Sequence, residues 1–346
     1  MEHKIALLGN TLDELKAIAA ELGMPSYAAK QLADWIYKKK VHDIAAMTNI
    51  PQKFRTLLSE RFEIGNVAPV EQLVSSDGTI KYLYQVGENR YVEAVYIPDK
   101  DRHTLCVSSQ VGCKMNCKFC MTGRQGFTAS LTAAEILNQI YSLPESDKLT
   151  NVVFMGMGEP LDNVDELLKV LDVLTGAYGY GWSPKRITVS TVGLLPGLRK
   201  ILLQSDCHIA VSLHNPYSVE RLEMMPVEKA YPLAKVLEEL EKFDFSHQRR
   251  LSFEYIVFAG WNDTPRHIKG LKLLLKNLSC RINLIRFHAF PGFDLASPSM
   301  AEMEKMRDTL SGGNLICTIR ASRGEDILAA CGMLSKTRLD LKEKNE

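Results

Sequence analysis

The stretch Cys106-Val-Ser-Ser-Gln-Val-Gly-Cys113-Lys-Met-Asn-Cys117-Lys-Phe-Cys120 carries three cysteines at the spacing C-x3-C-x2-C. A tight loop with this spacing can turn the thiolates of Cys113, Cys117 and Cys120 toward one point. Thiolates are soft ligands that suit iron–sulfur clusters, zinc and copper(I). A closed zinc site or an ordinary cubane takes four ligands. Three local thiolates would therefore leave one iron open to a small molecule.

The composition is that of a globular protein. The chain has 346 residues, of which 46% are hydrophobic and 24% charged, enough for one large domain and a small one. It contains no run of about 18 apolar residues, and its start lacks the apolar core of a signal peptide. We therefore expect a cytoplasmic protein whose eight cysteines stay reduced. A formal net charge of +1 gives no global support for nucleic-acid binding.

The first 65 or so residues have a helical pattern. Thr11 and Glu14 form a capping box, Ser26 can cap a second helix, and Pro51 begins a third. From Lys30 to Phe62 there are seven Lys or Arg residues and three Asp or Glu residues. Two interpretations stay open for this basic excess: solvated helix ends, or a module that holds RNA phosphates.

From about residue 66 the pattern changes to alternation. Residues 70–77, 80–86 and 90–97 predict a small antiparallel unit, which leads into a strand at 102–110. Strands and helices then alternate. The expected strands are 151–155, 186–190, 208–213, 252–258, 281–286 and 315–320; the expected helices are 132–142, 165–174, 231–242, 265–276 and about 298–310. Repeated β–α units predict an α/β fold with a parallel sheet, closed partly or fully into a barrel.

Candidate ligand-binding residues follow the strands of this sheet. Gly158 and Glu159 come after the strand at 151–155, Ser190 ends the next strand, and Ser212-Leu213-His214 ends the one after that. His288 lies just past a later strand. Each position alone is more often structural. Because chemistry collects at the carboxyl ends of barrel strands, their repetition at one rim favours a site. There Glu159 could hold an ammonium group, and Ser and His side chains could bind ribose and carboxylate.

The remaining cysteines fall into two groups. Cys207, Cys280 and Cys317 lie in or beside apolar strands, which favours core thiols. Cys106 lies on the strand that enters the metal loop, and Cys331 ends a short helical segment at 325–331. Neither is spaced as a certain fourth ligand, but both could reach the mouth of the barrel.

Motifs along nearly the whole chain resemble the RlmN/Cfr family of radical S-adenosylmethionine (SAM) RNA methyltransferases, and RlmN more than Cfr. The motifs are Glu93-Ala-Val-Tyr-Ile-Pro, the cysteine stretch quoted above, Gln125-Gly-Phe127, Met155-Gly-Met-Gly-Glu-Pro160, Ser190-Thr191, Ser212-Leu-His214, Ile282-Asn-Leu-Ile285, Phe290-Pro-Gly292 and Arg323-Gly-Glu-Asp-Ile-Leu-Ala-Ala-Cys331-Gly.

The resemblance implies a partial (β/α)6 barrel of the TIM type, with a small N-terminal helical accessory domain. It implies that Cys113, Cys117 and Cys120 ligate a [4Fe–4S] cluster. Gly158, Glu159, Ser190 and Ser212 to His214 match the family's SAM contacts. The family usually has asparagine where this chain has His288, so a cofactor contact at that position would pass to a histidine.

The same resemblance implies a reaction. Such enzymes methylate C2 of one adenosine in 23S ribosomal RNA, and RlmN-type members also act on adenosine 37 of tRNAs. Cys331 matches the cysteine that is first methylated, Cys106 the resolving cysteine, and Glu93 the proton acceptor. Two SAM molecules would be used per turnover, with an electron donor such as flavodoxin or ferredoxin. Arg286, Arg320 and Arg323 near the mouth suit either RNA phosphates or ordinary ion pairs.

The expected organisation follows from these patterns. Residues 1–65 would be the helical, RNA-binding accessory domain, 66–100 an antiparallel connection, 101–335 the barrel with the catalytic cysteine segment, and 336–346 a polar tail. We expect a monomer. Two alternatives stay open: a Cfr-like enzyme acting at C8 of the same adenosine, and a non-catalytic RNA-binding protein with zinc on Cys106 and the three loop cysteines.

Overall fold

One curved sheet forms the centre of the molecule. The computed structural model describes residues 4–247, 249–289, 293–312 and 315–334, so the Phe290-Pro-Gly292 motif and the tail at 336–346 lie outside the described residues. The sheet has ten strands in the order β14-β13-β12-β11-β10-β9-β6-β5-β4-β3. Seven neighbouring strands run parallel: β6 (Arg102–Cys106), β9 (Asn151–Phe154), β10 (Ile187–Thr191), β11 (His208–Ser212), β12 (Leu251–Val257), β13 (Arg281–Arg286) and β14 (Ile316–Arg320).

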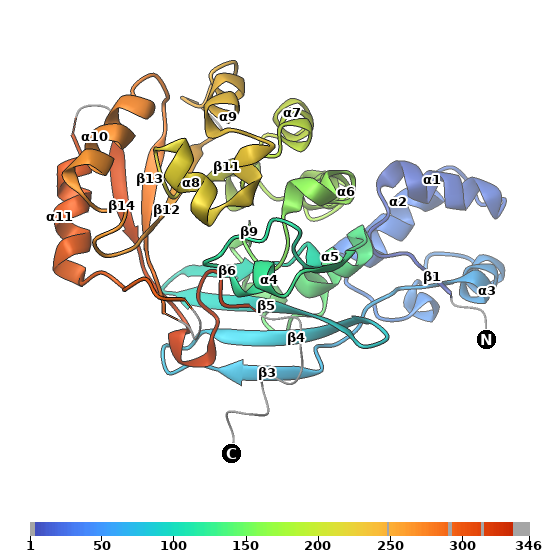
Figure 1. Cartoon of the computed structure of the whole chain (residues 1–346). Coiled ribbons are helices and arrows are strands. Elements are labelled where there is room, and N and C mark those ends of the chain that lie inside the picture. The colour runs from blue at the N-terminus through green and yellow to red at the C-terminus, as the bar shows by residue number, and fades with distance from the viewer. Residues whose placement is uncertain (1–3, 248, 290–292, 313–314, 335–346) are drawn as a thin grey trace.

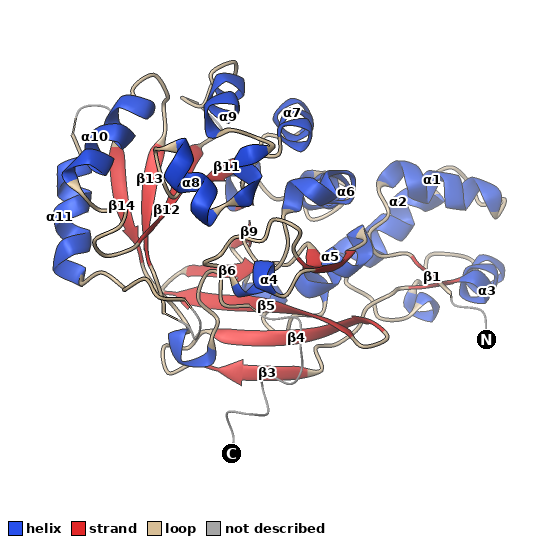
Figure 2. Cartoon of the chain, viewed as in Figure 1, coloured by secondary structure: helices blue, strands red, loops and turns tan. Residues whose placement is uncertain are grey.

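The parallel strands and the helices that cover them make an open, partial barrel. The strands are rich in β-branched residues and largely buried, as expected for a parallel sheet with both faces covered. Helices lie outside the sheet (Figures 1 and 2). They are α5 (Ala133–Tyr141), α6 (Val164–Thr175), α7 (Leu195–Gln204), α8 (Ser218–Met224), α9 (Leu233–Leu240), α10 (Pro265–Leu274) and α11 (Met300–Leu310). The predicted α/β fold class is confirmed, whereas α7 and α8 were missing from the predicted helices.

The antiparallel unit extends this same sheet. Strands β3 (Glu71–Val74), β4 (Ile80–Gly87) and β5 (Arg90–Asp99) pair in sequence, and β5 pairs antiparallel with β6. Residues 66–100 therefore add three antiparallel strands, β3 to β5, to the sheet beside β6; we call these three strands the antiparallel wall. The C-terminal segment, red in Figure 1, lies against this wall, where Ser75 Oγ donates to Asp326 at 2.6 Å and Lys81 Nζ to the Leu328 carbonyl at 3.5 Å.

The predicted strand at 102–110 is divided. Strand β6 ends at Cys106, and β7 (Gln110–Gly112) turns away to pair with β8 (Phe127–Ser130). Between them, the Ser109 N–H donates to the Met157 carbonyl, and the Met157 N–H donates to Ser108 Oγ. The loop after β9 therefore takes the hydrogen-bonding place of a neighbouring strand at Ser108 and Ser109. The chain leaves the sheet there and continues into the cysteine loop.

A helical unit precedes the sheet. It contains β1 (Ile5–Ala6), α1 (Leu12–Glu21), α2 (Ala28–Ala33) with a π-helical turn at Asp34–Lys38, α3 (Gln52–Arg61) and β2 (Phe62–Glu63), which pairs parallel with β1. The Thr11–Glu14 capping box is present.

This unit packs on the barrel and shares its hydrophobic core. Tyr37 contacts the rings of Tyr178 and Tyr180, and Lys40 reaches Asp147 at 2.6 Å. At residue 9, a Cβ would lie 2.4 Å from the Ala134 nitrogen, which requires the glycine found there. No helix in the part of the chain that the structure describes is long and apolar enough to cross a bilayer.

Candidate active site

The cysteine loop lies between two short elements. Cys113 follows β7, and Cys120 precedes α4 (Met121–Arg124). Gly112 has a φ of +79°, and a Cβ there would lie 1.8 Å from the Gly126 carbonyl oxygen, so only glycine fits this turn. The Cys113 N–H donates to that same carbonyl at 3.2 Å. The β7–β8 pair therefore fixes where the loop begins and returns.

The three loop cysteines line one cavity of about 140 Å³ at the carboxyl ends of the strands. Five predicted strand-end residues line it as well: Gly158, Glu159, Ser190, Ser212 and His214. The expectation that these positions meet at one rim is confirmed. Leu213 does not line this cavity, and its side chain is fully buried in the core.

The donor set of this cavity fits a cluster held by three cysteines. Among the described residues, no group of three His, Cys, Asp or Glu side chains is placed to hold a single metal ion. A cubane needs no such convergence, because each cysteine ligates a different iron. Burial raises the pKa of Cys113 to about 12 and that of Cys117 well above its usual value. Metal binding must therefore displace their protons.

Glu159 is a buried carboxylate with several donors around it. Its Oε1 accepts from Thr191 Oγ1 at 2.7 Å and from the Leu161 N–H at 3.1 Å, and its Oε2 accepts from the Val192 N–H at 2.9 Å. Burial raises its pKa to about 7, although these hydrogen bonds act in the opposite direction. At Gly158, a Cβ would lie 2.5 Å from Gln110, so the chain can pass there only without a side chain.

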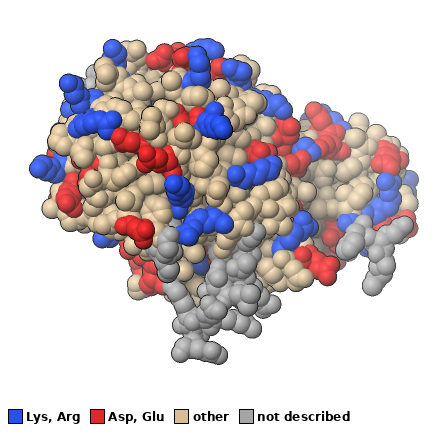
Figure 3. All heavy atoms as spheres, in the orientation of Figure 1, with Lys and Arg blue, Asp and Glu red and all other residues tan. Residues whose placement is uncertain are grey.

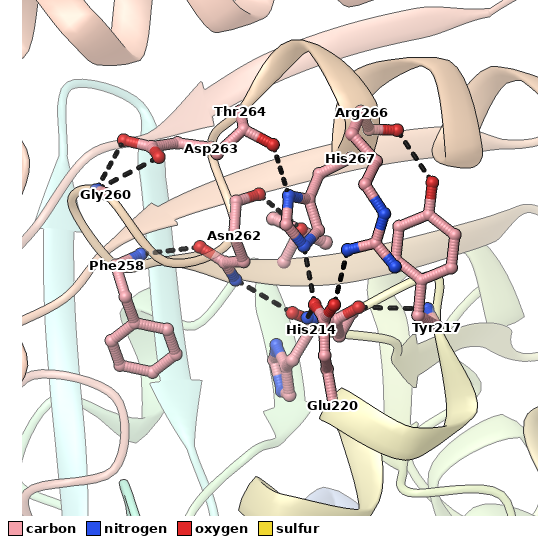
Figure 4. Close-up of polar contacts among 12 residues, drawn as sticks. His214, Tyr217, Glu220, Phe258, Gly260, Asn262, Asp263, Thr264, Arg266 and His267 are labelled. Atoms are coloured by element: carbon pink, nitrogen blue, oxygen red, sulfur yellow. Dashed lines mark hydrogen bonds and ion pairs between the residues drawn. The ribbon is translucent and has the colours of Figure 1, made fainter.

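His214 holds an uncommon backbone conformation, with a φ of +55°. Asn262 stabilises it: the Asn262 amide nitrogen donates to the His214 carbonyl at 2.8 Å, and the Asn262 Oδ1 accepts from the Phe258 N–H (Figure 4). The His214 Nδ1 accepts from the Ile256 N–H at 3.0 Å, and burial lowers the pKa of the ring to about 3. The ring is therefore neutral, with its proton on Nε2.

Arg221 is a supporting residue that sequence reasoning missed. Its guanidinium is fully buried and forms an ion pair with Glu228. It also donates to the carbonyls of Val192, Ser212 and Leu213. One side chain thus joins the ends of two strands behind the cavity. No local pattern in the sequence indicates this role, because the partners lie on several different elements and loops, one of them 29 residues away.

Cys331 lines the same cavity as the three loop cysteines. Electrostatic interactions link it to Cys106, Cys120 and Arg320, which places it near these three residues. Burial, with the nearby Cys331, raises the pKa of Cys106 to about 12. The expected helical segment at 325–331 is present only in its first three residues: a 3-10 helix at Glu325–Ile327 ends at Leu328, whose φ is +52°. The chain then turns so that the Gly332 carbonyl accepts from the Met121 N–H.

Glu93 and His288 lie outside this cavity. Glu93, on β5, forms a buried ion pair with Lys81 at 2.9 Å. It lies on the sheet face of Cys106, because Val95, two residues further along β5, is the partner of Cys106. His288 hydrogen-bonds through Nε2 with Ser322 Oγ at 2.7 Å and lines a second, adjoining cavity. The structure does not bring His288 to the cavity of the loop cysteines.

Comparisons with known proteins agree with this geometry. The model of the ribosomal RNA large subunit methyltransferase N-terminal domain matches residues 5–64, and that of the radical SAM superfamily matches residues 107–270. A relative from Parabacteroides distasonis, named "Probable dual-specificity RNA methyltransferase RlmN", is 63% identical over 98% of both chains. A "Dual-specificity RNA methyltransferase RlmN" from Syntrophus aciditrophicus is 38% identical over 98% of this chain and 99% of its own.

A solved structure is similar as well. The crystal structure of a radical SAM methyltransferase from Sphaerobacter thermophilus superposes with a TM-score of 0.88 at 35% identity, covering 95% of this chain and 99% of the other. The superfamily match also accounts for the three-cysteine loop, since radical SAM enzymes combine a [4Fe–4S] cluster with SAM. The chain belongs to the RlmN family of radical SAM methyltransferases.

Proposed function

We propose that the chain methylates C2 of one adenosine in 23S ribosomal RNA and of adenosine 37 in tRNAs, through a methylated Cys331 and a covalent enzyme–RNA adduct. The observation that carries the proposal is the shared cavity of Cys331 and the three loop cysteines, with Cys106 beside it. The names of the relatives support the substrate class, since they are called dual-specificity RNA methyltransferases. Methylation at C8 is the other outcome that a product analysis would distinguish.

Two different sets of residues around the cavity would hold the two cofactors. Cys113, Cys117 and Cys120 would hold the [4Fe–4S] cluster, and the strand ends at Gly158, Glu159, Ser190 and 212–214 would hold SAM. When bound, the cluster and two SAM molecules per turnover supply the methyl group, an electron and a radical. The Glu159 carboxylate suits the SAM ammonium group, and the His214 Nε2–H can donate to an acceptor.

The protein's own thiols carry the methyl group and release the product. Cys331 accepts the methyl group, and the bound cofactors would remove one hydrogen atom from it, so that the remaining methylene carbon bonds to C2 of the base. Glu93 then removes the C2 proton. The adduct would return one electron to the cluster when it loses this proton. Cys106 attacks the Cys331 sulfur, so that an S–S bond forms while the C–S bond breaks. The released electron pair and a proton complete the methyl group on the base. A thiol reductant must return two electrons to the resulting disulfide.

The placement of Glu93 supports its part as the base. It shares a sheet face with Cys106, and Ser108 Oγ donates to its carbonyl at 2.6 Å. Its ion pair with Lys81 lies beneath the segment that carries Cys331, because Lys81 also reaches the Leu328 carbonyl. To act as the base, the Glu93 carboxylate must leave Lys81 when RNA is bound.

Further partners complete the proposal. A flavodoxin or ferredoxin would supply electrons to the cluster, and the enzyme would act as a monomer in the cytoplasm. Exposed lysines of the helical unit, among them Lys30, Lys38 and Lys53, would contact RNA phosphates. Other cations already have partners: Lys39 pairs with Asp34 and Arg61 with Glu21. Basic and acidic residues are interspersed over the face seen in Figure 3, so any RNA contact is local.

Nucleoside mass spectrometry tests the proposal most broadly. RNA from cells with and without the gene is digested, and C2- and C8-methyladenosine are quantified separately for rRNA and tRNA. We expect 2-methyladenosine in both RNA classes only when the protein is present. Unchanged 2-methyladenosine in the deletion strain would contradict the proposal, and a loss of 8-methyladenosine alone would support the other position.

A further inference from the structure

The second cavity occupies the lumen of the barrel. It has a volume of about 380 Å³, within the range of sites for small ligands. Polar residues early in the parallel strands line it, among them Thr104, Thr188, Ser252, Asn283 and Thr318. It shares Met155, Glu254, Ile285, Arg320 and Cys331 with the cavity of the loop cysteines. A molecule in this second cavity would therefore also contact Cys331.

Glu254 stands at the junction of the two cavities. Its side chain is 4% exposed. Its Oε1 is fixed, because it accepts from Asn283 Nδ2 at 2.7 Å and from Ser252 Oγ at 3.1 Å. Its Oε2 forms a long ion pair with Arg320 Nη1 at 3.7 Å but accepts no hydrogen bond within the described part of the chain. A buried carboxylate oxygen left in this state needs a donor.

The target base carries a hydrogen-bond donor that could meet the Glu254 Oε2. An adenine offers a 6-amino donor, whereas a guanine carries an acceptor at the same position. Enzymes that act on extruded bases read them by hydrogen bonds to the Watson–Crick edge. In adenine, C2 and the 6-amino group flank the same ring nitrogen. A residue that binds the amino group must therefore lie about the width of one ring from the Cys331 methylene that bonds to C2. Glu254 and Cys331 line the same two cavities.

We infer that Glu254 Oε2 accepts a hydrogen bond from the 6-amino group of the target adenine. Glu254 is thereby the residue that selects adenine in the lumen. The inference rests on the proposed function, since it takes RNA adenosine as the substrate. Asn283 and Ser252 hold the other carboxylate oxygen, so the free oxygen has a defined direction before the base arrives.

A cycle of protein and RNA changes tests this contact. Wild-type enzyme and Glu254→Gln are each given an RNA with adenosine at the target position and the same RNA with purine riboside, which lacks the 6-amino group. Methylation rates at limiting substrate are measured by mass spectrometry. With adenosine RNA, Glu254→Gln should lower kcat/KM about 10- to 100-fold, the range for a hydrogen bond to a charged group. With purine-riboside RNA, the same substitution should change kcat/KM less than about threefold.

Controls separate the possible failures. Asp99→Asn, at an exposed part of the same cavity, should affect both RNAs equally. Cluster content, the melting temperature and methyl loading of Cys331 show whether Glu254→Gln folds and holds its cofactors. An equal loss on both RNAs would overturn the inference, because Glu254 would then serve SAM or the fold. Absence of methylation of adenosine RNA by the wild type would instead overturn the proposed function.

Discussion

At the residue scale, the site depends on thiols that differ in their surroundings. Cys113, Cys117, Cys120 and Cys331 line one cavity, whereas Cys207 is buried in the core at 1% exposure. Sequence spacing identified the three cluster cysteines, because they are local in the chain. It left Cys106 and Cys331 without a role, because 225 residues separate them and only the family resemblance joined them. Lys81 and Arg221 gave no signal, since their partners come from other elements.

Loss of one cluster cysteine should abolish both the cluster and SAM cleavage. Cys117→Ala removes a thiolate that no neighbouring group replaces in the C-x3-C-x2-C loop. Iron and sulfide analysis after anaerobic reconstitution, with an assay for 5′-deoxyadenosine, measures both. Cys207→Ala is the matched control and should keep a full cluster. Full SAM cleavage by Cys117→Ala would be incompatible with the assigned cluster.

SAM binding should weaken as the pH falls through 7. Burial raises the Glu159 pKa to about 7, so the carboxylate is protonated below this pH and loses its attraction for an ammonium group. Between pH 8 and pH 6 we expect affinity for SAM to fall about tenfold, in line with the ionised fraction. Isothermal titration of the reconstituted enzyme measures it. Glu159→Gln should bind weakly with no such pH dependence; a wild-type affinity that is flat over this range would count against the ion pair.

At the scale of elements, the alternation of strands and helices was predictable, because hydrophobic periodicity and helix-capping residues are local features of the sequence. Where tertiary contacts decide, prediction failed. The strand at 102–110 breaks because the loop after β9 takes the place of a ladder partner at Ser109. The segment at 325–331 forms only a short 3-10 helix, because Asp326 is held by Ser75 and Ser76, and Gly324 by Asp77. Neither competing contact is visible in the local sequence.

The antiparallel wall contains a buried ion pair, Lys81–Glu93, whose contribution to stability can be measured. Lys81→Met leaves the Glu93 carboxylate buried beside an apolar side chain. Because removing one partner of a buried ion pair is strongly destabilising, we expect a loss of about 3–5 kcal/mol in the free energy of unfolding. Urea denaturation measures it, with the exposed Lys235→Met as the control. A loss below about 1 kcal/mol would show that the pair contributes little.

At the scale of the whole molecule, the helical unit and the barrel share one core, and ion pairs such as Lys169–Glu14 join them. Deleting the unit would therefore expose apolar surface, and point substitutions test its RNA role better. Lys30, Lys38 and Lys53 replaced by Gln should reduce the slope of log affinity against log salt by about 0.7 for each lost phosphate contact. Filter binding at several salt concentrations measures this. An unchanged slope, with Lys235→Gln as the control, would remove the unit from the RNA interface.

The covalent adduct tests the central claim most directly. Cys106→Ala enzyme with a reconstituted cluster, SAM, reductant and target RNA should methylate Cys331, join it to the base and stop. With Cys106 gone and Cys120 bound to the cluster, no free thiol remains near the Cys331 sulfur to break the C–S bond. A denaturing gel should show a slowly migrating protein–RNA species that RNase removes, and mass spectrometry should place the link on Cys331. Cys331→Ala should form neither adduct nor methylated RNA. Normal turnover by Cys106→Ala, or methylated adenosine from Cys331→Ala, would contradict the account.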